Sequence, residues 1–268
     1  MDAASAVAMA CCMLQPQSTG IGGYVCCAVV REGRSDRIWS IDSNSHAPAA
    51  AHEGMFDTLP PRETGDSPNE HEYFCRVKHD ANMYGPLAVG TPGMMAGMGI
   101  VWERWGRLKW SDIIAPSQEL LADGFPFGTT AKAIAEKESV IRRFPATAAH
   151  LLPNGKLPSP DDHWHRPDME KTLQRIVKAG WRDFYQGEIG RKIADCIQRL
   201  GGMLTQRDLE TFEPRITDAI STTYRNATVY GPVLTNGCLT VLQVLNMLES
   251  LDFNRNENSS FRSDTTAY

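Results

Sequence analysis

The sequence predicts an α+β protein in which residues 1–268 form one domain. Two kinds of pattern support this prediction: apolar or amphipathic runs that stop at glycine are typical of helices, and β-branched runs beside polar turns are typical of strands. Both occur around Gln15–Val30, QPQSTGIGGYVCCAVV, where a glycine turn follows an Ala-rich run and leads into a strand-like run. The turn holds Gly20, Gly22 and Gly23, and we expect it to let another backbone approach closely.

The first half of the chain begins with a predicted buried helix, Asp2–Leu14. The strand pattern up to Val30 and the alternating run Arg37–Asp42 then predict a hairpin. Residues 59–79 are polar and proline-rich, which predicts a long exposed excursion. Leu87–Gly93 is predicted to be a short strand that closes on a Pro-Gly turn, and Met94–Trp105 a buried helix with small residues on one side.

The second half is mainly helical, with caps that mark most boundaries. Ser111, Thr130 and Asp168 are suitable N-caps, and Thr205–Asp208 has the pattern of an acidic capping box. Residues 150–166 are expected to be a loop. Helices are predicted at Asp112–Asp123, Ala131–Arg143, Met169–Ala179, Gly187–Leu200 and Cys238–Leu251, and strands at Ile216–Tyr224 and Ala227–Tyr230.

Composition excludes several classes of protein. The 268 residues carry a formal net charge of −5 without a basic stripe, so general nucleic-acid binding is not expected. No apolar run reaches the roughly 18–20 residues that cross a bilayer. Seven cysteines without a C-x-x-C motif predict buried thiols and are more typical of a reducing, cytoplasmic compartment. The first residues resemble the interior of a helix and the last ones lack a closing element, so we expect a piece of a longer protein.

Three groups of residues have the types expected of a phosphate site, a metal site or a catalytic nucleophile but lack the sequence pattern of such sites. The glycine turn precedes a strand and has no Gly-Lys-Ser/Thr, which argues against a phosphate cradle. Asp161–His165, DDHWH, has metal-ligand types, but two histidines in a loop without further ligands are expected to be solvated, and we predict neither metal nor cofactor. Thr222-Thr223 and Thr265-Thr266 are hydroxyl nucleophiles by type only, because no activating base accompanies them.

Five ordered blocks of the chain resemble the γ-glutamyltransferase family. DAASAVAMACCMLQPQSTGIGGYVCCAVV is similar to its D-A-A-x-A…E-P-x-x-S-G-I-G-G-G-x-F start, and IDSNSHAPAA to its I-D-x-R-E-x-A-P-x-x-A segment. LAVGTPGMMAGMGIVWERWGRLKWSDIIAPSQELLADGFPF, DFYQGEIGRKIADCIQRLGGMLTQRDLETFEPRI and GPVLTNGCLTVLQVLNMLESLDF resemble three further blocks in the same order.

The resemblance implies an N-terminal-nucleophile hydrolase with a four-layer αββα sandwich, of which this chain covers large-subunit territory. Such a precursor cleaves itself, and the new N-terminal Thr of the small subunit attacks a γ-glutamyl amide; the acyl group then passes to water or an amino acid. The family's T-x-H-x-S-V-V-D segment is absent here, so we expect no catalytic residue in this chain. The implied partners are the small subunit and a small-molecule amide.

One departure from the family bears on the substrate. The Arg of the R-E-x-A-P segment holds the substrate α-carboxylate in glutathione-cleaving members, and Asn44 occupies the matching position here. A neutral amide does not replace a charge-assisted contact. Arg62 or Arg76 could in principle substitute for the missing Arg, but both lie in the polar excursion, where we expect them to be solvated. Asn44 is therefore the expected substrate-binding residue. Related acylases or amidohydrolases with another substrate, and a non-catalytic scaffold, remain alternatives.

Overall fold

The computed structural model describes residues 1–33, 35–60, 76–233 and 237–251. By their internal contacts these residues divide into two compact units, one formed by Met1–Cys26 with Ser43–Pro214 and the other by Cys27–Asp42 with Arg215–Tyr268. Neither unit is a continuous stretch of chain. The single domain over residues 1–268 stays a prediction, and each unit is described by itself below.

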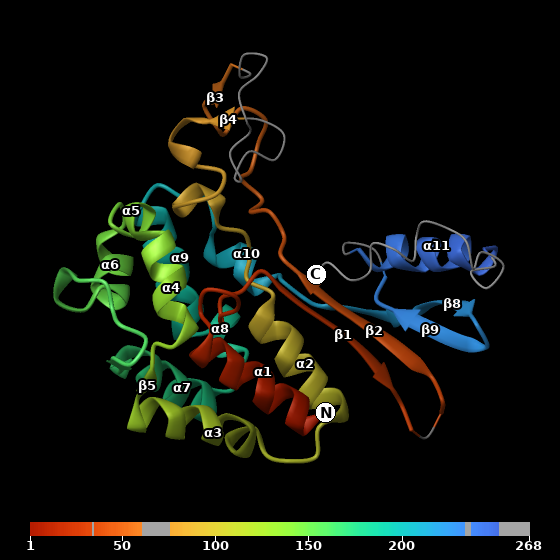
Figure 1. The fold of residues 1–268 in the computed structure, drawn as a ribbon. Coiled ribbons are helices and arrows are strands. Elements are labelled where there is room, and N and C mark those ends of the chain that lie inside the picture. Colours follow the sequence, from red (N-terminus) through yellow and green to blue (C-terminus); the bar gives the residue numbers. More distant parts are fainter. Residues whose placement is uncertain (34, 61–75, 234–236, 252–268) are drawn as a thin grey trace, which may run out of the picture. The chain divides into compact units, whose positions relative to one another are not determined.

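Helices build the centre of the first unit (Figure 1). Helix α1 (Asp2–Leu14) contacts α2 (Met94–Trp105) and α3 (Trp110–Asp123), and α3 contacts α7 (Pro167–Ala179). The bounds of α1 and α2 confirm the sequence prediction. Side chains at helical spacing fill the space between these four helices, and the most deeply buried are Met9, Met13, Met95, Ile113, Ile114, Leu173 and Ile176.

The small residues of α2 let bulky neighbours come close, as the sequence predicts. A side chain at Gly97 would overlap Cys26, and one at Gly99 would overlap the ring of Trp181. Because Trp181 is itself buried, this contact contributes a large apolar area to the core of the first unit.

Short elements complete the first unit. They are the helices α4 (Thr129–Glu136), α5 (Glu138–Ile141), α6 (Pro145–Leu151), α8 (Asp183–Gln186), α9 (Glu188–Arg199) and α10 (Gln206–Glu210). The 3-10 turns are η1 (Lys78–Asp80), η2 (Pro86–Ala88) and η3 (Pro153–Gly155). Two antiparallel pairs join β3 (Thr58–Leu59) to β4 (Arg76–Val77) and β5 (Phe125–Pro126) to β6 (His163–Trp164). The middle of the predicted excursion, residues 61–75, lies outside the described residues.

Several local predictions in the first unit are wrong. Leu87–Gly93 is not a strand: it contains η2 and one isolated bridge between Thr91 and His46. Helix α3 begins before Ser111, whose hydroxyl donates to the Asp112 carboxylate. The Thr130 hydroxyl donates to the side-chain oxygen of Gln17 at 2.8 Å in place of capping a helix. A tertiary hydrogen-bond partner thus overrides local capping preference.

Other boundaries shift for backbone reasons. Pro167 occupies the first turn of α7, so this helix starts before the predicted cap Asp168. The predicted loop 150–166 contains the end of α6 and the strand β6. The predicted helix Ala131–Arg143 is two helices, α4 and α5, with Lys137 between them. By contrast, the capping box of α10 is confirmed, with the Asp208 N–H donating to the Thr205 hydroxyl.

The second unit is built on a three-stranded sheet of order β1–β2–β7. Strand β1 covers Val25–Arg31 and strand β2 covers Ile38–Asn44. The beginning of β1 and the end of β2 are counted with the first unit. Strand β7 (Arg215–Asp218) runs antiparallel to β2, with Trp39 opposite Asp218 and Asp42 opposite Arg215. Ion pairs reinforce this register, because Arg37 binds Asp218 through two nitrogens and Arg215 binds Asp42 at 2.8 Å.

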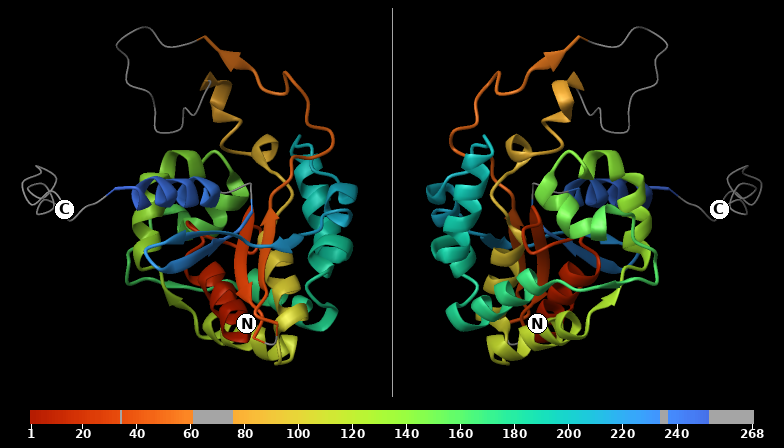
Figure 2. Two further views of the ribbon diagram at one scale, coloured as in Figure 1. Left: turned by 90° about the vertical axis from the view of Figure 1, so that its right-hand side faces the viewer. Right: turned by 90° about the vertical axis from the view of Figure 1, so that its left-hand side faces the viewer.

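A hairpin and a helix complete the second unit (Figure 2). Strands β8 (Ile220–Tyr224) and β9 (Ala227–Gly231) meet at Arg225 and Asn226, whose positive φ values of 46° and 66° are those of a tight hairpin turn. Helix α11 (Cys238–Glu249) lies against both strands. The predicted strand Ile216–Tyr224 is divided, because Ala219 separates β7 from β8 and the two halves join different sheets. Nowhere in the described residues is a helix long and apolar enough to cross a membrane.

Candidate functional site

The candidate site is the chain segment Ser43–Ala49, called the site segment below, which contains Asn44. The first two residues of this segment are the end of β2, in which successive side chains point to opposite sides. The Ser43 hydroxyl donates to the carbonyl of Gly93 at 2.7 Å, and Ser45 lies so close to Gly90 that a side chain there would overlap its hydroxyl. Ser43 and Ser45 therefore contact the Gly90–Gly93 backbone, and Asn44, which follows Ser43 in β2, is directed to the opposite side of the strand from Ser43.

Backbone hydrogen bonds fix the site segment at both ends. The Thr91 N–H donates to the His46 carbonyl at 2.8 Å, and the Ala49 N–H donates to the Asp208 carboxylate at 2.8 Å. Gly93 is itself held, because its N–H donates at 2.9 Å to the carbonyl of Gly23. The glycine turn thus supports the site segment indirectly, because Gly93 is bonded to both.

The close approach predicted for the glycine turn applies to one of its three glycines. A side chain at Gly23 would lie 2.8 Å from the carbonyl of Gly20 and 3.4 Å from Met94 Cβ. Around Gly20 and Gly22 no atom of the described residues lies within 4 Å of an added side chain, so the close approach predicted for these two stays a prediction. Gly23 alone combines the tight turn with the support of Gly93 and Met94.

Tyr185 braces the same region from α8. Its hydroxyl donates to the Pro92 carbonyl at 2.7 Å and accepts the Ala96 N–H at 2.9 Å. The side chain is buried, and burial raises the pKa of the Tyr185 phenol. Its ring stacks on Phe212, which in turn meets the edge of the His46 ring at a centroid distance of 5.1 Å. An aromatic wall therefore stands beside His46.

Asp208 links α10 to the site segment. One carboxylate oxygen accepts the Ala49 N–H, and the other accepts the N–H and hydroxyl of Thr205 at 2.8 and 2.5 Å. Burial alone would raise the pKa of Asp208, but these hydrogen bonds outweigh it and hold the pKa below its ordinary value. Asp208 is therefore ionised at neutral pH and directed at the backbone, away from a ligand role.

The side chain of Asn44 is half-buried and oriented by its own backbone. Its oxygen accepts the Ser45 N–H at 2.9 Å. His46, two residues along, is exposed. The site segment thus contains an amide and an imidazole, two side-chain types that form directional hydrogen bonds.

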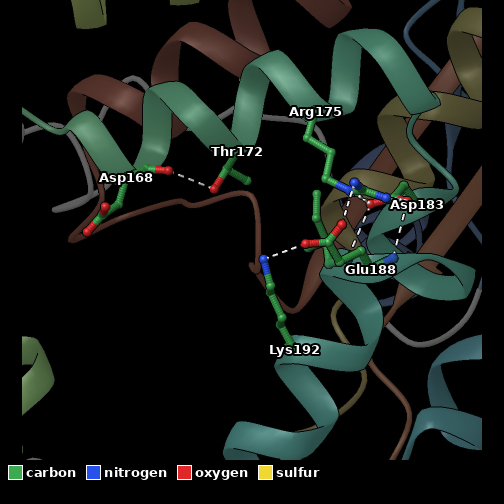
Figure 3. Close-up of polar contacts among 7 residues, drawn as sticks. Asp168, Thr172, Arg175, Asp183, Glu188 and Lys192 are labelled. Carbon is green, nitrogen blue, oxygen red and sulfur yellow. Dashed lines mark hydrogen bonds and ion pairs between the residues drawn. The ribbon is translucent and has the colours of Figure 1, made fainter.

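A second polar cluster, called the Arg175 cluster, lies between α7 and α9 (Figure 3). Arg175 binds Asp183 through two nitrogens, each at 2.7 Å, and Glu188 at 2.5 Å, while Lys192 binds Glu188 at 2.6 Å. Asp183 also accepts the N–H groups of Glu188 and Ile189 at 3.2 Å, which caps the start of α9. The guanidinium of Arg175 holds the pKa of Asp183 below its ordinary value.

The Arg175 cluster borders a hollow of about 520 Å³ whose apolar side is formed by Ile189, Ile193 and Ile197. Its size is suitable for a small ligand. Its charges are not, because the cations Arg175 and Lys192 are already neutralised by the carboxylates that bind them. We therefore interpret the cluster as a structural ion-pair network that joins α7, α8 and α9.

The remaining sequence candidates do not join either region. Asp162 accepts the Ser159 N–H within its loop, and His163 belongs to β6. Arg76 donates to the Pro60 carbonyl at 3.2 Å. The Thr222 hydroxyl hydrogen-bonds to Asn246 on α11, within the second unit. Arg62, Thr265 and Thr266 lie outside the described residues.

Sequence reasoning missed two supports of the site segment. Asp208 was predicted as part of a capping box, but nothing local indicated its bond to Ala49, 159 residues earlier. Tyr185 gave only a weak signal, as an aromatic residue in a block that resembles the family. Long-range bonds of this kind become visible only in the folded chain.

The whole described arrangement can be compared with known proteins. The model of the family described as gamma-glutamyltranspeptidase matches residues 1–267. The chain belongs to this family. Glutathione hydrolase 3 of Arabidopsis thaliana is 29% identical over 254 residues, covering 93% of this chain and 36% of the relative. The glutathione hydrolase proenzyme of Bacillus subtilis is 28% identical over 95% of this chain and 41% of the relative.

Two solved structures share the fold of this chain. Helicobacter pylori γ-glutamyltranspeptidase superposes with a TM-score of 0.84 at 24% identity, covering 97% of this chain and 71% of that chain. A cephalosporin acylase from Bacillus halodurans superposes with a TM-score of 0.75 at 24% identity, over 94% of this chain and 45% of that chain. The predicted α+β fold class is confirmed. The chain spans about two fifths or less of the curated relatives named here.

Proposed function

We propose that this chain is the large-subunit part of an enzyme that cleaves a γ-glutamyl or related amide by acyl transfer to water or an amino acid. The nucleophile would be the N-terminal Thr of a small subunit released from the same precursor. Support comes from the family match over residues 1–267 and from relatives whose names describe them as glutathione hydrolase proenzymes. A free α-amine can act as base for its own Thr hydroxyl, so such a subunit would need no metal or cofactor.

The single observation that carries the proposal is the fixed geometry of the site segment. Its backbone is held through His46 and Ala49, and Asn44 follows Ser43, whose hydroxyl donates to Gly93, at the end of β2. A rigid backbone that presents side chains at fixed positions is what substrate positioning requires. We propose that Asn44 contacts the end of the acyl donor remote from the scissile amide.

Asn44 also argues for a substrate range that differs from that of glutathione hydrolases. A hydrogen bond to a charged group contributes about 1.5–3 kcal/mol, against about 0.5–1.5 kcal/mol for a neutral one. The fold does not choose between substrates, since a γ-glutamyltranspeptidase and a cephalosporin acylase both superpose on this chain. An amide-cleaving acylase or amidohydrolase with a non-glutathione acyl donor is therefore the second candidate, and Asn44 is the observation that favours it.

The test uses the complete protein and the acyl donor γ-glutamyl-p-nitroanilide. In Asn44→Arg, a guanidinium facing the α-carboxylate should raise kcat/KM by about 10- to 100-fold, mostly through KM. Ala50→Arg is the matched control, because it adds the same charge at an exposed position just beyond the site segment. No gain in Asn44→Arg, or an equal gain in Ala50→Arg, would show that position 44 does not face the carboxylate.

A non-catalytic scaffold is the remaining alternative, and it differs in processing. The proposed enzyme must be cut into two subunits, the second beginning with Thr. Intact-mass measurement of the complete purified protein should therefore give two chains, and N-terminal sequencing of the smaller should begin with Thr. One uncut chain that releases no p-nitroaniline from this donor would favour the scaffold.

A further inference from the structure

We propose that Asp208 is a positioning residue of the enzyme, which acts on the acyl donor through the backbone of the site segment and touches no substrate itself. The inference rests on the proposed function, in which the site segment positions the acyl donor. It gives a kinetic role to a side chain whose sequence pattern predicts only a helix cap.

The carboxylate of Asp208 uses its two oxygens for two different tasks. One oxygen accepts the Ala49 N–H at 2.8 Å, and the other accepts the N–H and hydroxyl of Thr205 at 2.8 and 2.5 Å. The first bond belongs to the site segment, and the others belong to the N-cap of α10. Because the carboxylate is ionised at neutral pH, all of these bonds are charge-assisted, and such bonds are about twice as strong as neutral ones.

Helix α10, which carries Asp208, is anchored within the first unit. Leu209 is fully buried, and the Gln206 amide donates to the Tyr185 carbonyl at 3.0 Å. Phe212, just beyond the helix, stacks on the Tyr185 ring. Because the helix cannot shift without breaking these contacts, the carboxylate holds the site segment from a fixed place.

Ala49 lies at the end of the site segment farther from β2. The beginning of the segment is held by the Ser43 hydroxyl and its middle by the His46 carbonyl, so the bond from Asp208 adds a tie at the far end. A segment tied at both ends and in the middle has few backbone conformations, and loss of the far tie should restore some of that freedom. Side chains on a looser backbone hold the acyl donor less well.

Two variants of the complete protein separate the two tasks of the carboxylate. Thr205→Val removes the hydroxyl that caps α10 and leaves the carboxylate bonded to Ala49, whereas Asp208→Ala removes the cap and the bond to Ala49 together. Both should lower the midpoint of thermal unfolding. Only Asp208→Ala should raise the KM for γ-glutamyl-p-nitroanilide, by about 5- to 30-fold, with kcat within about threefold of wild type.

A merely structural role would change different kinetic constants. Destabilisation lowers the fraction of folded enzyme, which lowers the apparent kcat and leaves KM unchanged. Asp183→Asn is the control for this effect, because the Asp183 carboxylate also caps the start of a helix but pairs with Arg175 in place of a backbone N–H of the site segment. It should keep the wild-type KM.

A further variant removes the donor of the bond and leaves its acceptor. Ala49→Pro has no N–H at this position, while the cap of α10 stays intact. Its KM should rise as in Asp208→Ala. In the double variant KM should rise no further, because both changes remove the same bond.

Each outcome decides a different question. A wild-type KM in Asp208→Ala or, if that variant does not fold, in Ala49→Pro would overturn the role of Asp208 while leaving amide cleavage established. An equal rise of KM in Thr205→Val or Asp183→Asn would overturn it too, since the effect would then come from lost stability. Absence of p-nitroaniline release by the wild-type protein would overturn the proposed function and this inference together.

Discussion

The site segment and the Arg175 cluster both gather polar groups, but they use them in opposite ways. In the Arg175 cluster the charged side chains bind one another, and Asp183 also accepts hydrogen bonds from the first N–H groups of α9. In the site segment the backbone makes hydrogen bonds to Thr91 and Asp208, and within the described residues its own side chains form no ion pair with one another.

The difference shows why a hollow lined by charges is a weak indicator of function. The hollow of about 520 Å³ beside the Arg175 cluster has cations, carboxylates and an apolar side, yet Arg175 and Lys192 are neutralised by carboxylates of the protein. The site segment has a backbone held by hydrogen bonds and a half-buried Asn44 side chain. Substitutions in the Arg175 cluster should lower stability without changing kinetics. Substitution of Asn44 in the site segment should change kinetics without changing stability.

The largest expected effect is on the support of the site segment. A methyl group at Gly93 would overlap the Ser43 carbonyl, and neither backbone can move without breaking the bonds of Gly93 to Gly23 and of Ser43 to Gly93. We expect Gly93→Ala to cost about 3 kcal/mol or more, judged by soluble yield and the midpoint of thermal unfolding. Gly22→Ala, where the space is open, should stay within about 0.5 kcal/mol of wild type. Equal stability of the two variants would contradict the support described for Gly93.

A somewhat smaller effect is expected from breaking the Arg175 cluster. The Asp183 side chain is 6% exposed and accepts two bonds from Arg175 and two from the start of α9. Asp183→Asn should therefore cost about 2–4 kcal/mol in urea unfolding. The more exposed Glu188 provides the control, because Glu188→Gln should cost about 1 kcal/mol or less. The folded Asp183→Asn protein should keep wild-type kcat/KM; a specific loss of activity would mean that the cluster belongs to the site.

The same variant gives a dependence on pH with a definite sign. Arg175 lowers the pKa of Asp183 in the folded protein below the unfolded value, which is about 3.9 for an ordinary aspartate. The stability from this carboxylate is therefore fully present above about pH 4 and is lost as the pH falls through the lower folded value. The difference in unfolding free energy between wild type and Asp183→Asn should shrink on acidification. A difference that stays constant from pH 7 to pH 3 would contradict this account.

Local sequence patterns were sufficient where short-range physics decides the structure. The bounds of α1 and α2, the capping box of α10 and the turn at Arg225-Asn226 follow from periodicity, caps and turn residues. The family and the α+β fold class followed from ordered blocks of residues that resemble the family. Both levels of prediction depend on information within a few residues or on the order of motifs along the chain.

Tertiary bonds decided what the sequence did not indicate. Thr130 has the right chemistry for a cap, but its hydroxyl bonds Gln17. Leu87–Gly93 has a strand-like composition, yet it is held by hydrogen bonds to Gly23, His46 and Ser43 and not by the regular hydrogen-bond ladder of a sheet. The candidate site was predicted only as Asn44, since the bonds through Asp208 and Tyr185 join residues about 90 or more positions apart.

The central claim is that Asn44 faces the substrate. The most direct measurement is a crystal structure of the complete protein with L-glutamate, the product of γ-glutamyl transfer to water. We expect an α-carboxylate oxygen within about 2.7–3.2 Å of the Asn44 amide nitrogen. Glutamate bound with its α-carboxylate away from Asn44, with the site segment unchanged, would contradict the account.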